Sequence, residues 1–477
     1  MKTYDVVIVG GGTGGLVSAH IAAGLGARVA LVERDRTGGD CLWTGCVPSK
    51  SLIAAADLAH RMRHAQRVGL EPVQPRIDFA SVMARVRSAQ AAIEPHDSPE
   101  RLRAAGVEVI KATAAFSGAR TLRAGERELR FRRAIVATGS EPGLPPIPGL
   151  ADAEPLTSDD VWELEQLPPR LLVIGGGPIG CELAQAFARL GSAVVVLESL
   201  PRLLAREEPR ASRLVEERLR ADGVDVRTGL SLESVVAMSA GAGRAQLSDG
   251  TEVAFDRVLV ATGRSPRTRG LGLEAVGVDI GGAGNVITDA RLRTTNPAVY
   301  AVGDVTGGMP FTHVAAYHAR VAVPNALLGL RRRADTHGIP WVTFTDPEIA
   351  HVGLTRDQAR ERWGERTQLV DFDYENLDRA ITAGDATGFV CLIGDPKDRL
   401  VGATVAAPAG GEVIAELAAW MARRAKIDAV SRTVHAYPTF AEGPARAADE
   451  HIRRKLLNPR HRRLARPALA LGRLLAR

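Results

Sequence analysis

A short apolar strand, a glycine-rich turn and a helix follow one another twice in this chain, and this repeat restricts the possible folds more than any other feature. The first copy starts with an apolar run at residues 4–9 and continues as a helical pattern through Leu25. The second copy starts at residues 171–174 and continues to about Leu190. In each copy a further short strand follows the helix, as is typical of a doubly wound α/β unit. The chain therefore contains two related halves.

Each turn has the glycine spacing of a dinucleotide-binding loop. In such a loop the first glycine permits a tight turn, the second lets the backbone approach a pyrophosphate, and the third allows the helix to pack closely on the strand. The N-terminus of the helix stabilises the phosphate charge. The glycines at these positions are Gly10, Gly12 and Gly15 in the first copy and Gly175, Gly177 and Gly180 in the second.

An acidic residue follows each loop at the distance expected for a ribose contact. Glu33 and Glu198 each stand at the end of the next strand, 23 positions after the first glycine of their copy. Two dinucleotide sites in one chain predict FAD in one and NAD(P)H in the other, with hydride passing between nicotinamide and flavin. The carboxylate of Glu198 would repel a 2′-phosphate and so favours NADH, although Arg202 and Arg206 could offset this effect.

The remaining patterns indicate how the chain is divided. Each half later ends a strand on Ala-Thr-Gly, which places Gly139 and Gly263 at the two dinucleotide sites. A proline-rich connection follows Gly139, a buried strand is expected at 298–305, and short alternating strands after Pro340 favour an antiparallel sheet with helices. The expected parts are 1–150 and 271–339 for the FAD-binding domain, 151–270 for the NAD(P)-binding domain, 340–450 for an α+β domain and 451–477 for a tail.

Four cysteines are too few for a disulfide scaffold, yet two of them form a distinct pair. Cys41 and Cys46 lie five positions apart, between glycines, at the start of a helical segment. Such a pair can close a small disulfide ring, and a thiolate near a helix N-terminus has a lowered pKa. We expect no zinc site, because the sequence has no second cysteine or histidine pair at a suitable spacing. Cys181 and Cys391 lie in apolar patterns typical of a core.

The basic charge of the chain is concentrated at its C-terminal end. The formal net charge is +6, while residues 451–477 carry nine Arg and Lys and no Asp or Glu. We favour a solvated terminus with a short apolar helix after Pro467 over contact with an anionic membrane surface. Nucleic acid is not expected, because no aromatic residues lie between the arginines. No apolar run reaches about 18 residues and Asp5 interrupts any signal peptide, so we expect a cytoplasmic protein.

Several motifs together resemble one family of flavoenzymes. They are GGGTGG at 10–15, GGDCLWTGCVPSK at 38–50, GGGPIGCE at 175–182, AVGDV at 301–305 and FTDPEIAHVG at 344–353. Over about residues 4–450 the chain resembles the FAD-dependent pyridine nucleotide–disulfide oxidoreductases of class I. This family includes dihydrolipoamide dehydrogenase, glutathione reductase and mercuric reductase. The resemblance implies an α/β fold with two Rossmann-like domains and a C-terminal α+β dimerisation domain.

The resemblance also implies a role for individual residues. Cys46 would be the flavin-proximal thiolate, and Cys41 would be the interchange thiol that meets the substrate. Lys50 and Glu182 would form an ion pair beside the flavin, where the hydride arrives. Asp304 would hold the ribityl chain of FAD.

One position departs from the pattern of the disulfide reductases. Their acid/base histidine directly precedes Pro-Thr, with a glutamate five residues later. Here Tyr437 occupies that position, Glu442 is present, and His435 lies two residues upstream. A tyrosine with a pKa near ~10 is a poor base at neutral pH. His435 could still reach the thiol, and the other interpretation gives it an interface or helix-flanking role.

A tyrosine at this position resembles mercuric reductase and its relatives, in which thiolates bind a soft metal ion near a tyrosine. The stretches 377–380 and 96–100 also resemble that branch. Two features differ from mercuric reductase, because the tail at 451–477 has no cysteine and no metal-binding domain is expected before Tyr4. The resemblance further implies a homodimer in which Tyr437 and Glu442 face Cys41 of the partner subunit.

We therefore expect an oxidoreductase that passes electrons from NAD(P)H through FAD to a Cys41–Cys46 disulfide and on to a small oxidant or a soft metal ion. The metal would be a transient substrate at the two cysteines, with no resident metal site. One alternative is a dihydrolipoamide dehydrogenase or another low-molecular-weight disulfide reductase. A second is an NAD(P)H:quinone reductase that docks on a membrane by its tail, and a third is a non-catalytic subunit of a multienzyme complex.

Overall fold

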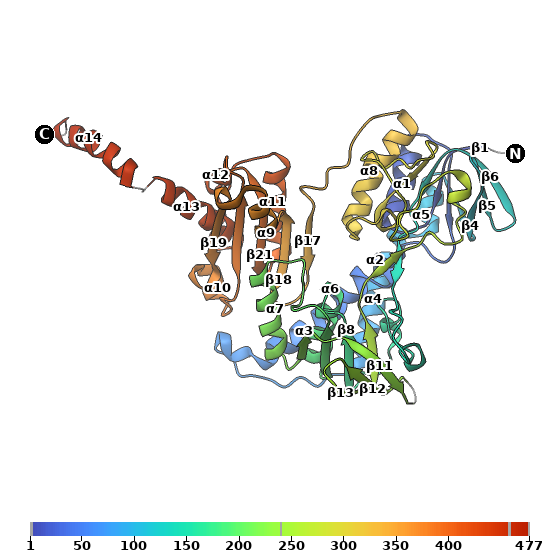
Figure 1. Ribbon diagram of the computed structural model, residues 1–477, viewed down its shortest axis with the longest axis horizontal. Helices are drawn as coiled ribbons and strands as arrows, with labels where there is room; N and C mark the ends of the chain where they lie inside the picture. Colours follow the sequence, from blue (N-terminus) through green and yellow to red (C-terminus); the bar gives the residue numbers. More distant parts are fainter. Residues whose placement is uncertain (1–2, 239–240, 457–458, 476–477) are drawn as a thin grey trace. The chain divides into compact units, whose positions relative to one another are not determined.

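The computed structural model describes residues 3–238, 241–456 and 459–475, and the chain forms two compact units. The first unit contains the residues up to 63 together with 74–203 and 219–335. The second contains 64–73, 204–218 and the residues from 336 onward. In Figure 1 the first unit is drawn mainly in blue to yellow and the second mainly in orange to red.

The first glycine repeat folds into a mostly parallel sheet of seven strands. β1 (Thr3–Val9) lies between β2 (Val29–Glu33) and β6 (Arg127–Val136) and is parallel to both, and α1 (Thr13–Gly24) connects β1 to β2. The other strands of this sheet are β3 (Val107–Lys111), β4 (Ala114–Gly118), β5 (Thr121–Ala124) and β16 (Val299–Ala301). β16 pairs with β6, so a late part of the chain returns to complete the first sheet.

The second repeat folds into a parallel sheet of four strands in the order β10-β9-β8-β14. β8 (Arg170–Ile174), α6 (Pro178–Leu190) and β9 (Ala193–Glu198) reproduce the strand, helix and strand of the first copy. The other two strands of this sheet are β10 (Asp225–Thr228) and β14 (Arg257–Val260). A separate antiparallel sheet of three strands contains β11 (Leu232–Ala237), β12 (Gly243–Leu247) and β13 (Glu252–Phe255).

A short antiparallel ladder joins the two connections between these sheets. β7 (Ser140–Pro142) and β15 (Arg264–Pro266) each follow an Ala-Thr-Gly strand end directly, and they pair with each other. The helices of the first unit that bear on the site are α2 (Gly39–Trp43), α3 (Cys46–Arg63), α4 (Phe79–Asp97), α5 (Pro99–Ala104) and α8 (Thr312–Leu328).

The second unit is built on an antiparallel sheet in the order β17-β18-β21-β20-β19, as predicted for the residues after Pro340. Its strands are β17 (Pro340–Thr343), β18 (Glu348–Gly353), β19 (Gln368–Asp373), β20 (Phe389–Gly394) and β21 (Leu400–Ala407). α11 (Gly410–Ala422) packs against β18 and β21, and α13 (Glu442–Leu456) packs against β19 and β20. The other helices are α7 (Pro209–Ala221), α9 (Arg356–Trp363), α10 (Asp378–Thr382), α12 (Ile427–Arg432) and α14 (Pro459–Leu475).

Two local predictions were wrong in their extent. The strand expected at 298–305 ends at Ala301, because Gly303 adopts φ +74° and turns the chain into a 3-10 segment, Gly303–Thr306. The apolar helix expected after Pro467 is part of the longer α14, which contains that proline. Arginine, leucine and alanine favour helix on both sides of it. No helix within the described ranges is both long and apolar enough to cross a membrane.

Candidate active site

Neither glycine turn has room for a side chain at its bend. Gly10 has φ +105°, and a Cβ on it would lie 2.4 Å from the carbonyl oxygen of Ala137. A Cβ on Gly15 would lie 1.9 Å from the carbonyl oxygen of Gly10. The second turn repeats this geometry, with φ +108° at Gly175 and the same 1.9 Å clash for a Cβ on Gly180. Both helices therefore pack against their strands at a distance that only glycine allows.

The two glutamates reach back to their own glycine turns. Oε2 of Glu33 accepts a hydrogen bond from the backbone N–H of Gly11 at 2.5 Å. Oε2 of Glu198 accepts one from the N–H of Gly176 at 2.7 Å. Each carboxylate is thus held at the carboxyl end of a parallel strand, beside the N-terminus of a helix. Open parallel sheets bind nucleotides in this crevice.

The first crevice contains a pocket of about 150 Å³. Its walls include the glycine turn, the end of β2 and the segment that follows β15, and among its lining residues are Gly10, Glu33, Thr138, Arg267 and Arg269. Close backbone, a carboxylate for ribose hydroxyls and the basic Arg269 for phosphates suit a dinucleotide such as FAD. The guanidinium group of Arg267 is paired with carboxylates. Gly139 (φ +70°) and Gly263 (φ +145°) lie just beyond β6 and β14, in conformations that favour glycine.

Both cysteines of the predicted redox pair are free thiols in this structure. Cys46 is the first residue of α3, so its sulfur lies at a helix N-terminus. A hydrogen bond with Cys41, a contact with Thr312 and the charge of Lys50 lower the pKa of Cys46 to about 6, against the opposing effect of burial. The same hydrogen bond, together with burial, raises the pKa of Cys41. The pair therefore holds a thiolate at Cys46 and a proton at Cys41 near neutral pH.

The surroundings of Cys46 come from distant parts of the sequence. Oγ1 of Thr312, in the first turn of α8, lies 3.3 Å from Sγ of Cys46. Nζ of Lys50, one turn along α3, forms an ion pair with Oε2 of Glu182 on α6 at 2.9 Å. The Glu182 side chain is only 8% exposed and that of Lys50 is 37% exposed, so a largely buried carboxylate links the cysteine-bearing α3 to the helix of the second repeat.

Asp304 lies just ahead of α8, in the segment where the first sheet ends. Its Oδ2 accepts a hydrogen bond from Oγ of Ser140 at 2.7 Å. Burial raises the pKa of Asp304, and the Ser140 hydrogen bond opposes the rise. Ser140 thus restrains the carboxylate of Asp304, and the role of Asp304 toward the ribityl chain stays a prediction.

The other predicted site residues belong to the second unit. Tyr437 is 65% exposed, and its hydroxyl donates a hydrogen bond to Oδ2 of Asp378 on α10 at 2.7 Å. This hydrogen bond, with the charge of Asp378, raises the pKa of Tyr437 above its usual value. The phenol is therefore a hydrogen-bond donor at neutral pH, and it is not a base.

His435 and Glu442 have partners other than Tyr437. The His435 side chain is 8% exposed, with Nε2 2.7 Å from Oε2 of Glu416 and Nδ1 2.9 Å from the carbonyl oxygen of Thr433. Oε1 of Glu442 pairs with Arg446 at 2.7 Å. Its buried Oε2 has no hydrogen-bond partner within the described part of the chain. The ring of His435 is therefore engaged by Glu416 and Thr433, and it does not take the place of the missing histidine.

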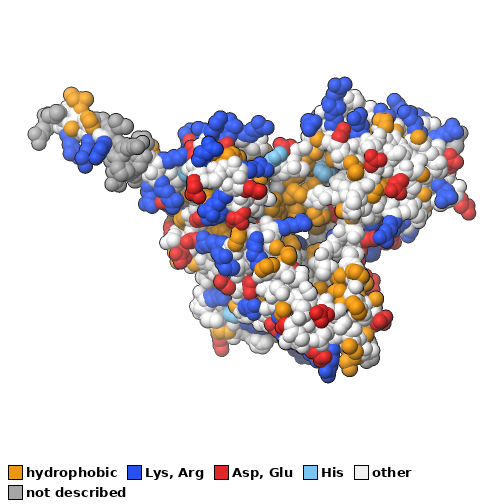
Figure 2. Space-filling view, in the orientation of Figure 1, with side chains coloured by type: hydrophobic (Ala, Val, Ile, Leu, Met, Phe, Trp, Pro, Cys, Tyr) orange, Lys and Arg blue, Asp and Glu red, His pale blue; other side chains and the backbone are white. Residues whose placement is uncertain are grey.

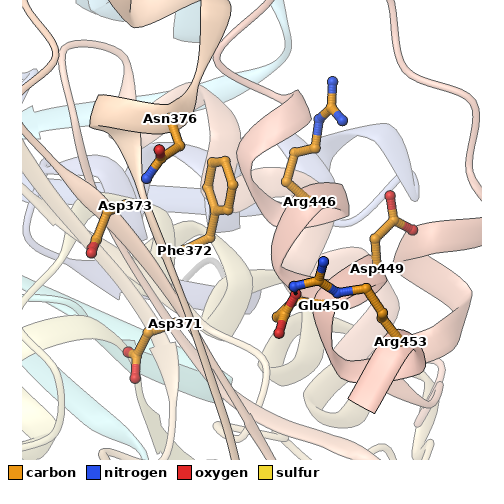
Figure 3. Close-up of a pocket in the computed structure, with 8 residues that line it drawn as sticks. All are labelled: Asp371, Phe372, Asp373, Asn376, Arg446, Asp449, Glu450 and Arg453. Carbon is orange, nitrogen blue, oxygen red and sulfur yellow. Dashed lines mark ion pairs between the residues drawn. The ribbon is translucent and has the colours of Figure 1, made fainter. Parts of the chain in front are cut away.

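A pocket of about 410 Å³ in the second unit is lined by β19, the turn after it and α13 (Figure 3). Its lining residues are Asp371, Phe372, Asp373, Asn376, Arg446, Asp449, Glu450 and Arg453. Several of these charges are already paired, as in the ion pair of Arg453 with Glu450 at 2.5 Å. None of the predicted site residues lines this pocket, so we assign it no catalytic role.

Sequence reasoning missed three residues that the structure brings to these sites. Thr312 contacts Cys46, Asp378 binds Tyr437, and Arg264 joins several segments near Cys41. Asp378 belongs to the stretch noted only for its resemblance to mercuric reductase, and Arg264 follows the second Ala-Thr-Gly directly. Cys181 and Cys391 are fully buried, as predicted.

Comparison with known families agrees with this geometry. The family described as pyridine nucleotide-disulphide oxidoreductase matches residues 4–319. The dimerisation domain of the same family matches residues 339–448.

Individual relatives match nearly the whole chain. A mercuric reductase from Streptomyces lividans is 38% identical over 455 residues, which cover 93% of this chain and 95% of that protein. A dihydrolipoyl dehydrogenase from Thermus scotoductus is 35% identical over 472 residues, which cover 94% and 97%. The sequence is thus similar to members with different substrates.

Two solved structures share the architecture of this chain. The Cu(II) complex of the HOCl-induced flavoprotein disulfide reductase RclA from Escherichia coli has a TM-score of 0.84 and 28% identity, covering 94% of this chain and all of that one. LpdA from Mycobacterium tuberculosis has a TM-score of 0.85 and 28% identity, with the same coverage.

Proposed function

The chain belongs to the pyridine nucleotide-disulphide oxidoreductase family, and from this premise we propose that it uses NAD(P)H and FAD to reduce a soft metal ion or another small oxidant at Cys41 and Cys46. One observation carries the choice of substrate. The thiol pair holds a thiolate at Cys46, while the residue in the position of the acid/base histidine is Tyr437, whose raised pKa keeps it protonated. When bound, FAD accepts hydride from NAD(P)H and supplies an electron pair to the disulfide.

The residues of this chain control where charge and protons lie during that reduction. Two electrons break the S–S bond, Cys46 remains a thiolate, and Cys41 takes one proton from solvent. Thr312 and Lys50 stabilise the Cys46 thiolate, as the lowered pKa of that thiol reflects. For Hg(II) as oxidant the overall reaction converts NAD(P)H and Hg(II) into NAD(P)⁺, a proton and Hg(0), which balances two electrons.

A soft metal ion suits this site better than an organic disulfide. Thiol–disulfide exchange needs a group that takes and returns a proton, which typically contributes ~10²–10⁴ in rate. Tyr437 donates to Asp378, and His435 is engaged by Glu416 and Thr433, so neither is placed for this task. Thiolates bind soft metals without such a base. The similarity to a mercuric reductase supports the same choice.

NADH is the proposed electron donor. Glu198 is held by the N–H of Gly176 and, through Oε1, by the N–H of Leu200 at 2.8 Å. This fixes a negative charge where a 2′-phosphate would lie. Replacement of Glu198 by Ala should lower kcat/KM for NADH and raise it for NADPH, and equal kinetics for the two donors in the unaltered protein would contradict the assignment.

The site is proposed to be completed in a homodimer through the matched dimerisation domain. Residues 151–270 would bind NADH, residues 1–150 and 271–339 would bind FAD, and residues 340–450 would form the interface. Tyr437 and Glu442 of one subunit would then serve Cys41 of the partner subunit. Light scattering of the active protein should give the dimer mass, and a monomer that turns over normally would contradict this assembly.

Quinone reduction at a membrane surface is the second candidate function, and α14 is the observation that favours it. Leu469, Leu471 and Leu475 are 59%, 58% and 79% exposed on a helix that also exposes Arg463, Arg466 and Arg473. Figure 2 shows apolar and basic side chains together among the described residues of this C-terminal helix. A basic helix with exposed leucines is suited to an anionic lipid surface.

Steady-state turnover distinguishes the candidates. NADH and NADPH are each tested against Hg(II), Cu(II), lipoamide, oxidised glutathione and a water-soluble quinone. We expect Hg(II) or Cu(II) turnover that is lost in Cys41→Ser and Cys46→Ser. Quinone turnover that survives both substitutions, with no metal-ion turnover, would favour the second candidate. Fast lipoamide turnover would identify a disulfide reductase.

A further inference from the structure

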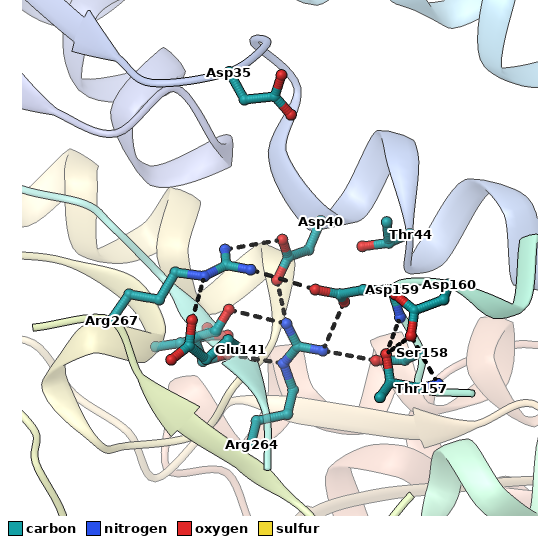
Figure 4. A network of polar contacts seen from close by, with 12 residues as sticks. Asp35, Asp40, Thr44, Glu141, Thr157, Ser158, Asp159, Asp160, Arg264 and Arg267 are labelled. Atoms are coloured by element: carbon teal, nitrogen blue, oxygen red, sulfur yellow. Dashed lines mark hydrogen bonds and ion pairs between the residues drawn. The ribbon is translucent and has the colours of Figure 1, made fainter. Parts of the chain in front are cut away.

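Two arginines meet three carboxylates where the connections between the two sheets cross. Arg264 lies in β15 and Arg267 follows it, and Figure 4 shows both guanidinium groups pointing at Asp40. Arg264 binds Oδ2 of Asp40, and Nη1 of Arg267 lies 3.3 Å from Oδ1 of the same carboxylate. Both arginines also pair with Asp159, at 3.6 and 3.4 Å, and Arg267 pairs with Glu141 at 3.6 Å.

Asp40 is the residue directly before Cys41 in α2. The carbonyl oxygen of Asp40 accepts the N–H of Thr44 at 3.0 Å, so Asp40 also shapes the backbone of the loop that leads to Cys46. Arg264 and Arg267, which lie far from Asp40 in the sequence, therefore hold the start of the cysteine segment in place through the Asp40 carboxylate.

The other nitrogens of Arg264 connect this carboxylate to Asp304. Nε donates to Oγ of Ser140 at 2.9 Å and Nη2 donates to the Ser140 carbonyl oxygen at 3.0 Å. Oγ of Ser140 in turn donates to Asp304 at 2.7 Å. Nη1 of Arg264 donates to Oγ of Ser158 at 2.9 Å. One planar guanidinium group thus joins the cysteine segment, β7 and the aspartate predicted to hold the ribityl chain.

The network is shielded enough for its geometry to matter. The side chain of Arg264 is 16% exposed, compared with 34% for Asp40 and 26% for Asp159. Burial is the largest effect on Asp304 and raises its pKa. The charge of Asp40 raises this pKa further, and the charge of Arg264 lowers it. Only the fork of an arginine can donate in these directions at once, and a lysine ammonium cannot.

We propose that the Arg264–Asp40 pair is a positioning device that holds the Cys41 segment in register with Ser140 and Asp304. This inference rests on the proposed function, because it assigns the device to reduction of the Cys41–Cys46 disulfide. Arg264 is a positioning residue, since it acts through Asp40 and Ser140. A displacement of about 1 Å at a reacting pair can cost ~10²-fold in rate.

The test compares Arg264→Gln, Arg264→Lys, Asp40→Asn and the double variant of Asp40→Asn with Arg264→Gln. Arg170→Gln is the matched control, because it removes a bidentate arginine–aspartate pair elsewhere in the same unit, with Asp256. Two readouts are used on the FAD-loaded protein: the rate at which NADH produces the long-wavelength charge-transfer absorption of the Cys46 thiolate, and amide hydrogen exchange in residues 38–44.

We expect Arg264→Gln and Arg264→Lys to slow appearance of that absorption about tenfold and to speed exchange in residues 38–44 by a similar factor. Asp40→Asn should have a smaller effect in the same direction. The double variant should recover at least threefold over Arg264→Gln, because it removes the Asp40 carboxylate that would otherwise have lost one of its two arginine partners. FAD content should match that of Arg170→Gln. The melting temperature should fall further than in Arg170→Gln, because the Arg264 side chain is 16% exposed and that of Arg170 is 51% exposed.

Appearance of the absorption at the unaltered rate in Asp40→Asn and in Arg264→Gln would overturn the positioning role. If the rate loss in the double variant equals the combined losses of the two single variants, the two side chains act independently and the proposed pairing is overturned. If Arg264→Gln does not fold, Asp40→Asn keeps the test decisive, because it removes the charge of the carboxylate without changing the size of the side chain. Failure of the proposed function gives a different result. If the cysteine pair is not reduced at all, the unaltered protein shows no charge-transfer absorption, and if the oxidant is not a metal ion, the absorption appears but Hg(II) and Cu(II) are not turned over.

Discussion

The hydroxyl of Tyr437 donates a 2.7 Å hydrogen bond to Oδ2 of Asp378, and this contact decides which way a proton can move at that position. The carboxylate of Asp378 raises the pKa of Tyr437, so the phenol stays protonated across the physiological range. Replacement of Tyr437 by His should introduce a group that titrates near pH ~6.5 and can accept a proton from a thiol. We expect lipoamide turnover to rise by about 10²-fold, measured with NADH at pH 7.5.

Two controls separate this effect from a change in folding. Tyr437→Phe removes the donor without adding a base, so it should leave lipoamide turnover at its low level and reduce metal-ion turnover. His435→Ala should leave lipoamide turnover unchanged, since both nitrogens of His435 are engaged elsewhere. Loss of residual lipoamide activity in His435→Ala would show that His435 is the base after all.

The pH dependence of the cysteine pair follows from the lowered pKa of Cys46. With a pKa of about 6, the thiolate is present above that pH and is lost as the pH falls through it. The charge-transfer absorption of the reduced protein should therefore disappear on the acid side with a midpoint near pH 6. An optical titration from pH 4.5 to 9 measures this midpoint.

Thr312 offers a specific variant for this titration. Its hydroxyl contacts Cys46 at 3.3 Å and is one of the causes of the lowered pKa. Thr312→Val keeps the shape of the side chain and removes the hydroxyl, so the midpoint should move to higher pH. Thr295→Val is the control, because it removes a hydroxyl that donates to the Gly277 carbonyl oxygen and accepts the N–H of Asp279, away from the cysteines. An unshifted midpoint in Thr312→Val would show that the Cys41 hydrogen bond and the charge of Lys50 suffice.

The sequence predicted the glycine turns, both parallel sheets and the cysteine pair because these depend on local rules. A strand, a glycine spacing and an acid 23 positions later fix one crevice without any long-range information. Contacts such as Thr312 with Cys46, or Arg264 with Asp40, join residues more than 200 positions apart. Such pairs depend on how β15 and α8 return to the first repeat, which no local pattern encodes.

The C-terminal tail is a second example of structure that local sequence patterns do not predict. Helix propensity predicts helical structure after Pro467, but it does not predict that α14 would continue through the proline. The partners of His435 were also beyond sequence reasoning, because Glu416 lies on α11, a helix that packs on the sheet from another part of the chain.

The second glycine of each turn provides a matched pair of variants for the two dinucleotide sites. Gly12 and Gly177 both have extended backbone that alanine can adopt. A Cβ on Gly12 would meet nothing closer than 3.7 Å, and a Cβ on Gly177 would meet nothing within 4 Å. Both variants should therefore fold. The added methyl group would instead occupy the space through which the backbone approaches a pyrophosphate.

The two variants should lose different ligands. Gly12→Ala should be purified with little FAD, and its flavin absorbance per protein should fall at least tenfold. Gly177→Ala should keep its FAD and show a KM for NADH raised at least tenfold. Normal FAD content in Gly12→Ala, or loss of FAD in Gly177→Ala, would show that the two crevices are assigned in the wrong order.

The C-terminal helix makes a prediction about membranes that is independent of catalysis. Residues 451–477 carry nine basic residues and no acidic ones, and each basic residue near an anionic surface contributes roughly 1 kcal/mol. The sequence alone favours a solvated terminus, but the exposed Leu469, Leu471 and Leu475 on α14 change this expectation. We therefore predict binding to vesicles that contain phosphatidylserine, weakened by salt. Co-sedimentation with vesicles that contain phosphatidylserine and with pure phosphatidylcholine vesicles measures this binding.

Two variants test the role of the helix. Deletion of residues 457–477 should abolish sedimentation and leave turnover of a water-soluble oxidant unchanged. Leu471→Glu should weaken binding without removing any basic charge. Equal sedimentation of the deleted and complete chains would show that α14 is a solvated terminus.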